Sequence, residues 1–435
     1  MTGIAAILQR AALTAADIQR FPPPDFESGY TLPLTTTPAP RDPWLSGLDG
    51  LVLFAALSVG AYLVHIKRSR LSVFLLMVFS LLYFGFYRLG CVCAIGSIQN
   101  VSLAIADPSY AIPLPVVAFF LFPLAFTLFF GRVFCAGVCP LGAIQDLVLI
   151  KPIAVPVWLQ PALGLLAYLY LGAAVLFAAM GSAFIICEYD PFIAFFRLNG
   201  NLNIVILGVS LLVIGLFVGR PYCRFLCPYG VILRHFSRLS HWRVTITPQD
   251  CHNCQICEES CPFGAINPPA SETAAGPGEP NFHRLIPYVM LAPLLVALCG
   301  WVFTTAGGSF SKMDYTVRLA ERIVWEDTGQ VNGTTDASKA FRDSGEPKEA
   351  LLQKARQVRD RYVWAGWFLG TFFGLVLSGK LIRLSLPDRG DGYEADRGDC
   401  LACARCFSYC PQERKRRRTS RTVPAAAGSE AVTES

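Results

Sequence analysis

The chain has 435 residues, of which 53% are hydrophobic and only 16% carry a charged side chain. Soluble globular proteins have a smaller apolar share and about a quarter of charged residues, so this composition excludes an ordinary soluble enzyme and indicates a membrane protein. The formal net charge is +6 at neutral pH. Because no DNA-binding module is recognisable, we interpret the excess of Lys and Arg as a signal of membrane orientation and expect no nucleic-acid partner.

We expect no cleavable signal peptide in residues 1–45, because Gln9, Arg10 and Asp17 interrupt any apolar stretch, and these residues predict an exoplasmic Pro-rich tail. Beyond this tail, each of seven apolar windows is near the roughly 20 residues that cross a bilayer. They cover residues 46–65, 71–88, 112–131, 157–179, 201–219, 284–303 and 362–382. We therefore predict an all-α polytopic membrane protein with about seven transmembrane helices, five of them in a membrane domain over residues 46–242.

Basic residues flank alternate windows. Lys67, Arg68 and Arg70 follow the first window, Arg220 begins a group of arginines after the fifth, and a basic run over residues 414–418 comes near the end of the chain. Lys and Arg next to a membrane span mark its cytoplasmic side. We therefore expect the N-terminus outside, the C-terminus and both cysteine-rich segments described below in the cytoplasm, and a location in the bacterial inner membrane.

Four cysteines fall on the predicted outer side: Cys91, Cys93, Cys187 and Cys299. An electron cannot usefully cross roughly 30 Å of hydrocarbon without an intermediate site, so we hypothesise an outer redox or metal site at these residues. The alternatives are cysteines that simply pack in apolar surroundings, or an exoplasmic disulfide. Cys299 is the weakest member, since it lies in an ordinary hydrophobic helix.

The third and fifth windows end in the same motif. Its copies are Gly131-Arg-Val-Phe-Cys135-Ala-Gly-Val-Cys139-Pro and Gly219-Arg-Pro-Tyr-Cys223-Arg-Phe-Leu-Cys227-Pro. Cysteines at i and i+4 share a helix face, and a following Pro ends or kinks the helix. We predict that Cys135, Cys139, Cys223 and Cys227 have a redox or metal-binding role, as one four-thiolate site or as two dithiols. The alternative is a packing role as small hydrophobic side chains. The pattern C-P-x-G-x-I that begins at each last cysteine recurs from Cys93, without the Pro.

Residues 243–270 and 383–411 each contain the run C-x2-C-x2-C-x3-C-P of bacterial ferredoxins, whose thiolates bind a 4Fe-4S cluster. In paired runs of this kind the fourth cysteine ligates the other cluster. The two expected ligand sets are therefore Cys251, Cys254, Cys257 and Cys410, and Cys400, Cys403, Cys406 and Cys261. A structural zinc site fits less well, because its two ligand pairs stand a dozen or more residues apart. A disulfide framework is disfavoured in a reducing cytoplasm.

The remaining segments connect these parts. Residues 271–283 are rich in Pro, Gly and Ser and predict a flexible linker before the helix over residues 284–303. Residues 304–361 have helical periodicity and mixed charge, which predicts an exoplasmic helical segment that is either a solvated cap or a docking face. After the helix over residues 362–382 and the second ferredoxin run, residues 412–435 predict a basic disordered tail.

Two G-R-x-[FY]-C-x3-C-P-x-G segments followed by paired ferredoxin runs resemble the NosR/NapH family of polytopic membrane iron–sulfur proteins. The resemblance implies a membrane electron carrier, with two 4Fe-4S clusters, that serves an exoplasmic (periplasmic) reductase. The sequence does not support a flavin, because the longer NosR members carry a flavin-binding domain before the first helix and only a short tail stands there. A further thiolate-bound metal centre would come from the cysteines outside the ferredoxin runs.

We therefore expect electron transfer between a cytoplasmic or quinone-pool donor and an exoplasmic acceptor protein, by an electron carrier or oxidoreductase subunit rather than a self-contained enzyme. One alternative is an assembly or copper-handling factor that matures a metalloenzyme, since thiolates suit Cu(I). The other is a redox regulator.

Overall fold

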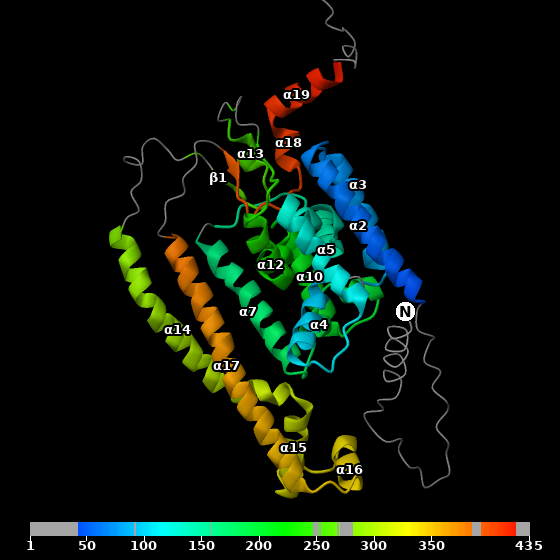
Figure 1. Ribbon diagram of the computed structural model, residues 1–435, viewed down its shortest axis with the longest axis vertical. Coiled ribbons are helices and arrows are strands. Elements are labelled where there is room, and N and C mark those ends of the chain that lie inside the picture. The colour runs from blue at the N-terminus through cyan, green and yellow to red at the C-terminus, as the bar shows by residue number, and fades with distance from the viewer. Residues whose placement is uncertain are drawn as a thin grey trace, which may run out of the picture.

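The computed structural model describes residues 42–90, 93–156, 158–246, 251, 254–267, 269, 282–384 and 393–422. Over these residues the chain is mostly helical. Figure 1 shows two groups of short elements at opposite ends of the longest axis. The helices α13 (Ile256–Glu259) and α18 (Arg405–Tyr409) lie at one end, and α15 (Tyr315–Asp327) and α16 (Asp336–Asp343) lie at the other.

The first half of the membrane domain alternates long apolar helices with short ones. Its elements are α2 (Pro43–His65), α3 (Arg70–Ser80) with the π-helical continuation η1 (Leu81–Tyr87), α4 (Ala94–Ala106), α5 (Leu114–Phe130), the π-helical η2 (Phe134–Val138) and α6 (Pro140–Val148). Helix α3 begins after Ser69, whose hydroxyl accepts a hydrogen bond from the Ser72 amide at 3.5 Å, as an N-cap does. Helix α5 ends at Gly131, whose φ of 70° favours glycine and turns the chain back into the bundle.

The second half repeats this alternation. It contains α7 (Leu159–Ala179), α8 (Ile185–Tyr189), α9 (Ile193–Arg197), α10 (Leu202–Gly215), α11 (Pro221–Phe225) and α12 (Pro228–Arg238). Both α6 and α12 start with a Pro, which is favoured at the first helical position because that amide has no partner within the helix. The two CxxxCP motifs therefore produce similar local structure, a short helical element that contains the first cysteine and then a short helix that begins after the second.

Five helices among the described residues are long and apolar enough to cross a membrane. These candidate spans are Trp44–His65, Arg70–Tyr87, Leu159–Ala179, Leu285–Met313 and Lys348–Arg383. The other two predicted windows form shorter helices, with 17 residues in α5 and 14 in α10. The membrane character of the chain is thus confirmed, whereas the count of seven spans is not. The sequence reading also missed α4, a third short apolar helix.

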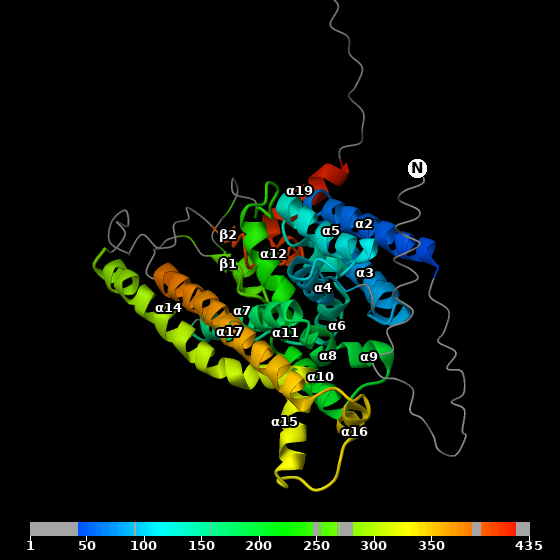
Figure 2. The same cartoon turned by 60° about the horizontal axis from the view of Figure 1, so that its bottom comes forward.

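The last two long helices form a separate hairpin. Figures 1 and 2 show α14 (Phe282–Phe310) beside α17 (Lys348–Leu384) on one flank of the bundle, with α17 facing α7. Gly366, Gly370 and Gly374 line the contact, and a Cβ on Gly374 would come within 2.7 Å of the Val296 Cα. Glycines four residues apart let two backbones approach closely, so this stripe explains why the helices pack in this way. Both helices extend well beyond their predicted windows.

The two ferredoxin segments meet at one end of the bundle. Strand β1 (Ile266–Asn267) pairs antiparallel with β2 (Glu394–Ala395), with Ile266 opposite Ala395. The all-α prediction did not include this short pairing, because backbone pairing of segments about 130 residues apart has no signal in local periodicity. The predicted disordered tail is also corrected over its first residues, which form α19 (Pro411–Thr422). Its Glu413 is buried and lies 3.3 Å from Arg68, which holds the start of the helix against the bundle.

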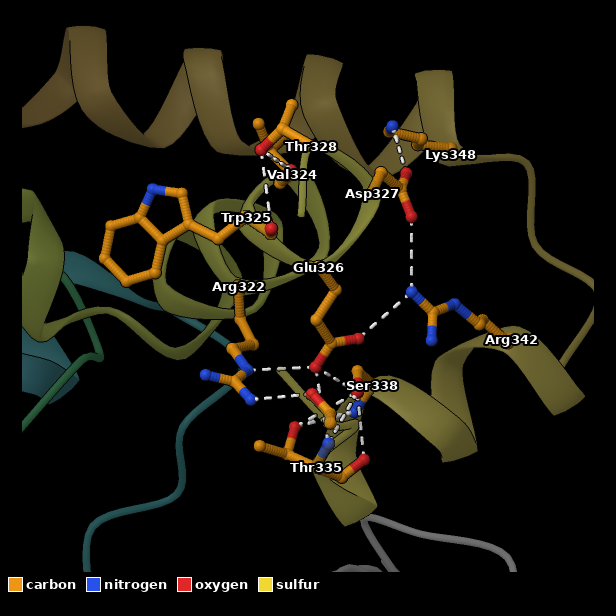
Figure 3. A network of polar contacts seen from close by, with 11 residues as sticks. Arg322, Val324, Trp325, Glu326, Asp327, Thr328, Thr335, Ser338, Arg342 and Lys348 are labelled. Atoms are coloured by element: carbon orange, nitrogen blue, oxygen red, sulfur yellow. Dashed lines mark hydrogen bonds and ion pairs between the residues drawn. The ribbon is translucent and has the colours of Figure 1, made fainter. Parts of the chain in front are cut away.

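The opposite end is a small helical unit between α14 and α17. A short 3-10 turn, η3 (Ser311–Met313), leads into α15 and then α16. Figure 3 shows Glu326 at the centre of a polar network that joins them, with Arg322 at 2.9 Å, Ser338 at 2.9 Å and Arg342 at 3.0 Å. Thr335 and Ser338 form a capping box at the start of α16. The predicted helical segment over residues 304–361 thus has a defined fold of its own.

Candidate functional site

The CxxxCP motifs place their last cysteines at the starts of short helices. Cys139 directly precedes α6 and Cys227 directly precedes α12. The Cys227 Sγ accepts a hydrogen bond from the Gly230 amide at 3.3 Å, in the way that a serine oxygen would cap a helix. The amides and the dipole at a helix N-terminus favour negative charge, so this position suits the thiolate form that binds metals.

The structure brings the four cysteines of these motifs together. Cys135, Cys139, Cys223 and Cys227 are all less than a tenth exposed and belong to the same packed core. Cys139 and Cys227 each interact electrostatically with Cys135 and Cys223. We call these four residues the quartet. Because all four thiols share one interior space, the arrangement favours one four-thiolate site over two separate dithiols.

Two polar side chains, Gln145 and Arg132, contact the sulfurs of the quartet, one in each CxxxCP motif. Gln145 on α6 donates from Nε2 to the Cys223 Sγ at 3.3 Å and accepts from the Tyr222 amide at 3.0 Å. Arg132 lies 3.8 Å from the Cys135 Sγ and donates to the Gly398 carbonyl at 3.2 Å. Hydrogen bonds to cysteine sulfurs are one of the means by which proteins set the potential of a bound cluster. These contacts also tie the first motif to the second and to the second ferredoxin segment.

Arg220 is fully buried between the quartet and the ferredoxin end. Its guanidinium lies 3.4 Å from the Asp146 carboxylate and donates to the carbonyls of Cys135 and Ala136. A buried guanidinium needs partners of this kind, since an unpaired buried charge is costly. Arg220 also acts electrostatically on Cys223 and on Cys403, so it connects the quartet with the second ferredoxin run.

Asp146 is the common partner of three arginines. Besides Arg220, it pairs with Arg70 and lies 3.5 Å from Arg405, which stands inside the second ferredoxin run. Burial alone would raise the pKa of Asp146, but Arg220, Arg70 and Arg405 offset this and hold its pKa well below the ordinary value. The carboxylate therefore stays ionised and fastens the ferredoxin end to the membrane domain.

The second ferredoxin run gathers with the last cysteine of the first run. Cys406 interacts electrostatically with Cys403, Cys400 and Cys261, and Cys400 interacts with Cys403 and Cys261. The Ala402 amide donates to the Cys400 Sγ at 3.4 Å. Burial raises the pKa of the Cys400 thiol to about 12, and a bound metal favours the thiolate form. This is the grouping expected for crossed ligation.

The first run provides the other set. Cys257 interacts electrostatically with Cys251 and Cys254, and burial raises its thiol pKa above the ordinary value. Cys410, the fourth member that we predict, follows α18, and α18 packs against α13 of the first run. Its membership of this set stays a prediction.

Of the four predicted outer cysteines, the structure places two together. Cys93 precedes α4 and Cys187 lies in α8, and both sulfurs are within 4 Å of the position that a Cβ on Gly96 would occupy. We call Cys93 and Cys187 the distal pair. Cys299 instead packs in the hairpin, where its carbonyl meets Gly370 of α17. Cys91 lies outside the described residues.

Within the described part of the chain, no three His, Cys, Asp or Glu side chains converge on one point as the ligands of a single metal ion do. This applies to the quartet and to both ferredoxin sets. A polynuclear cluster is different, because each of its thiolates binds a different iron atom and the sulfurs stand further apart. The buried sulfurs of the quartet, with the Gly230 amide donating to Cys227, fit an iron–sulfur cluster better than a mononuclear ion.

Several of these residues have roles that the sequence reading did not assign. Gln145 and Asp146 were not recognised, and Arg220 was counted only as a charge that marks the cytoplasmic side. One signal was present: Gly-Arg precedes both CxxxCP motifs, as Gly131-Arg132 and Gly219-Arg220. An arginine repeated at the same distance from two cysteine pairs is better explained by contact with the site than by membrane flanking.

A helical membrane domain that buries four cysteines and carries two ferredoxin-type segments at one end defines a membrane iron–sulfur protein. Comparison with known families agrees. A family model described as a 4Fe-4S binding domain matches residues 112–165 and 201–247, which include the whole quartet. A second model with the same description matches residues 244–267, which include the first ferredoxin run.

Three curated proteins are similar to parts of the chain. The chain is 36% identical to protein NirI of Paracoccus denitrificans over 155 residues, which are 32% of this chain and 23% of NirI. It is 31% identical to regulatory protein NosR of Stutzerimonas stutzeri over 208 residues, or 44% of this chain and 29% of NosR. It is 28% identical to the putative electron transport protein YccM of Escherichia coli over 156 residues, or 32% of this chain and 43% of YccM. The chain thus matches less than half the length of each of these three relatives, and no solved structure matches it. The chain is therefore similar to NirI, NosR and YccM over part of its length, and it contains two regions that match 4Fe-4S binding-domain models.

Proposed function

We propose that this protein relays electrons through the membrane, between its ferredoxin segments on the cytoplasmic side and an acceptor protein on the opposite side. In this proposal each ferredoxin set holds one 4Fe-4S cluster, and the quartet holds a third. A bound cluster supplies reversible one-electron chemistry. The protein supplies the thiolates, the hydrogen bonds to their sulfurs and a dry interior.

One observation carries the proposal: a chain of buried polar contacts, from the Cys135 carbonyl through Arg220 and Asp146 to Arg405, links the quartet with the second ferredoxin run. In an electron relay, consecutive redox centres must lie close together. Arg220 acts electrostatically on cysteines of both the quartet and the second ferredoxin set. A pair of independent structural sites would not need buried ions to connect them, because burying these charges has a substantial desolvation cost.

The electron donor in this proposal is either a cytoplasmic reductant or the quinone pool. A largely apolar cavity of about 720 Å³ lies between α4, α7 and α17, lined by residues such as Ile98, Val175, Trp364 and Phe368. Ligand pockets for lipid-soluble molecules have this size and character. Phe120, which also lines the cavity, accepts from the Tyr229 hydroxyl at 2.6 Å through its carbonyl, and Tyr229 acts on Cys135, Cys227 and Cys139. One hydrogen bond therefore links the lining of the cavity to a residue that acts electrostatically on the quartet, which supports the quinone alternative.

Serine substitutions in the quartet test the proposal. Cys139→Ser and Cys227→Ser should each remove about four iron atoms per chain together with one electron paramagnetic resonance signal of the reduced protein, while the ferredoxin signals remain. Cys299→Ser, in the hairpin, should change neither measurement. If iron content and spectra were unchanged in both quartet variants, the quartet would hold no cluster. The relay would then lack its central redox centre.

A further inference from the structure

The segment around the distal pair repeats the local structure of the quartet. Gly96 and Gln99 follow Cys93 by three and six residues, as Gly142 and Gln145 follow Cys139. The Gly96 amide donates to the Cys93 Sγ at 3.3 Å, as the Gly230 amide does to Cys227. The chain therefore presents another cysteine at the start of a short apolar helix, with the same hydrogen bond to its sulfur.

The two glutamines contact their partner cysteines in the same manner. Gln145 accepts through Oε1 from the amide just before Cys223. Gln99 accepts through Oε1 from the amides of Ile186 and Cys187, at 3.1 and 3.4 Å. In both places a glutamine six residues after one cysteine fixes the backbone at a second cysteine that is far away in the sequence. This repetition of tertiary contacts goes beyond the similarity in sequence.

The two copies differ in what satisfies the polar atoms. Gln145 Nε2 donates to the Leu141 carbonyl and to the Cys223 Sγ. The Nε2 of Gln99, a fully buried residue, has no hydrogen-bond partner among the described residues. A buried donor without a partner keeps its full desolvation cost, so its presence points to a group that the chain itself does not provide.

A buried carboxylate adds an independent observation at the same place. Asp190 is 2% exposed, and its Oδ1 accepts from the Phe192 amide at 2.9 Å. Its Oδ2 has no hydrogen-bond partner in the described part of the chain, and Asp190 and Cys187 both act electrostatically on Cys93. The two sulfurs thus lie beside Gly96, where a Cβ would come within 3.3 Å of the Cys187 Sγ, and the Asp190 carboxylate acts electrostatically on one of them.

We propose that Cys93, Cys187 and Asp190 bind a further iron–sulfur centre, the distal centre, and that it passes electrons between the quartet and the acceptor protein. Thiolate and carboxylate are both iron ligands, and a polynuclear cluster fits the spread of these groups better than a single ion does. Gln99 donates to the centre, in the manner of Gln145 at Cys223. The inference rests on the relay proposed above.

The distal centre lies away from the ferredoxin segments but close to the quartet. Helix α3 begins at Arg70, which donates to the Cys403 carbonyl, and Cys93 comes only after the far end of η1. Cys93 nevertheless acts electrostatically on Cys139 of the quartet. The Tyr222 hydroxyl, which is buried, interacts with both Asp190 and Cys227. The distal centre is therefore the next redox centre for an electron that leaves the quartet toward the end of the molecule that contains α15.

The test compares full-length variants purified without oxygen. Cys93→Ser and Cys187→Ser should each lose the same iron and the same paramagnetic signal, while the quartet and ferredoxin signals remain. Cys299→Ser, the matched control, should lose none. The ferredoxin and quartet signals of the wild type are measured in the same experiment. If these signals were absent, the relay would be refuted. If they were present and neither distal variant lost iron or a signal, only the distal centre would be refuted.

A milder variant provides a second test in case the Cys93→Ser and Cys187→Ser variants do not fold. Asp190→Asn keeps both thiols and the size of the side chain but removes a negative charge. It should raise the midpoint potential of the distal centre in a redox titration, because the reduced form carries the additional electron, and it should leave the ferredoxin potentials unchanged. Potentials that are all equal to those of the wild type would overturn the assignment of Asp190 and, together with unchanged iron in the serine variants, the centre itself.

Discussion

Replacing Arg220 by Met removes the buried charge that joins the quartet to the ferredoxin end, while it keeps a side chain of similar length. The change leaves the carbonyls of Cys135 and Ala136 without their donor and takes one of three arginines from Asp146. Breaking a buried pair by removing one partner costs about 3–5 kcal/mol. Because Arg70 and Arg405 still neutralise Asp146, we expect the lower end, about 3 kcal/mol.

A loss of about 3 kcal/mol in a bundle of roughly 200 residues corresponds to a fall of about 6–12 °C in apparent Tm. Thermal unfolding of the detergent-solubilised protein measures it. The control is Lys354→Met, which breaks an exposed pair with Glu346 at 3.4 Å and should shift Tm by no more than about 2 °C. If Arg220→Met unfolded within the same 2 °C of the wild type, the reasoning about a buried ion that fastens the ferredoxin end would be wrong.

Three further changes have defined outcomes. Gly370→Leu should separate α14 from α17 and lower the yield of folded protein, whereas Gly379→Leu, where a Cβ would meet nothing within 4 Å, should be tolerated; gel filtration in detergent compares them. Burial by itself would raise the pKa of Glu326, but hydrogen bonds from its neighbours lower the pKa overall. The ionised side chain therefore stabilises the α15–α16 unit above the ordinary pKa of 4.5, and this stabilisation is lost as the pH falls below it. Hydrogen exchange in α16 would detect the loss, and Glu326→Gln should remove the pH dependence. Arg132→Gln removes a positive charge 3.8 Å from the Cys135 Sγ and should lower the midpoint potential of the quartet centre in a redox titration, while an unchanged potential would mean that Arg132 does not influence the centre.

Hydropathy predicted which windows are helical but not how far each helix extends. Windows 46–65 and 157–179 correspond closely to α2 and α7, because an uninterrupted apolar stretch specifies both the helix and its membrane position. The third window gave α5, which ends almost where the window does, and the fifth gave α10, which stops a turn before the end of its window. Helix α4 was missed because its 13 residues fall below the length that a search for membrane spans recognises.

Cysteine spacing predicted the ferredoxin runs, because a local motif of this kind determines which sulfurs can reach a common centre. It could not reveal the polar residues between the sites. Asp146 and Arg405 are 259 positions apart, and nothing in the sequence near either one names the other. The same limit applies to the distal pair: the C-x-x-G pattern after Cys93 was visible, but only the fold brings Cys187 and Asp190 beside it.

The relay through the quartet can be tested by electron transfer across a sealed membrane. The full-length protein would be reconstituted into liposomes that contain trapped ferricyanide, and a membrane-impermeant one-electron reductant would be added outside. We predict that the wild type and Cys299→Ser reduce the trapped ferricyanide, and that Cys139→Ser and Cys223→Ser, which retain their ferredoxin signals, do not. Transfer by both quartet variants at the wild-type rate would contradict the relay.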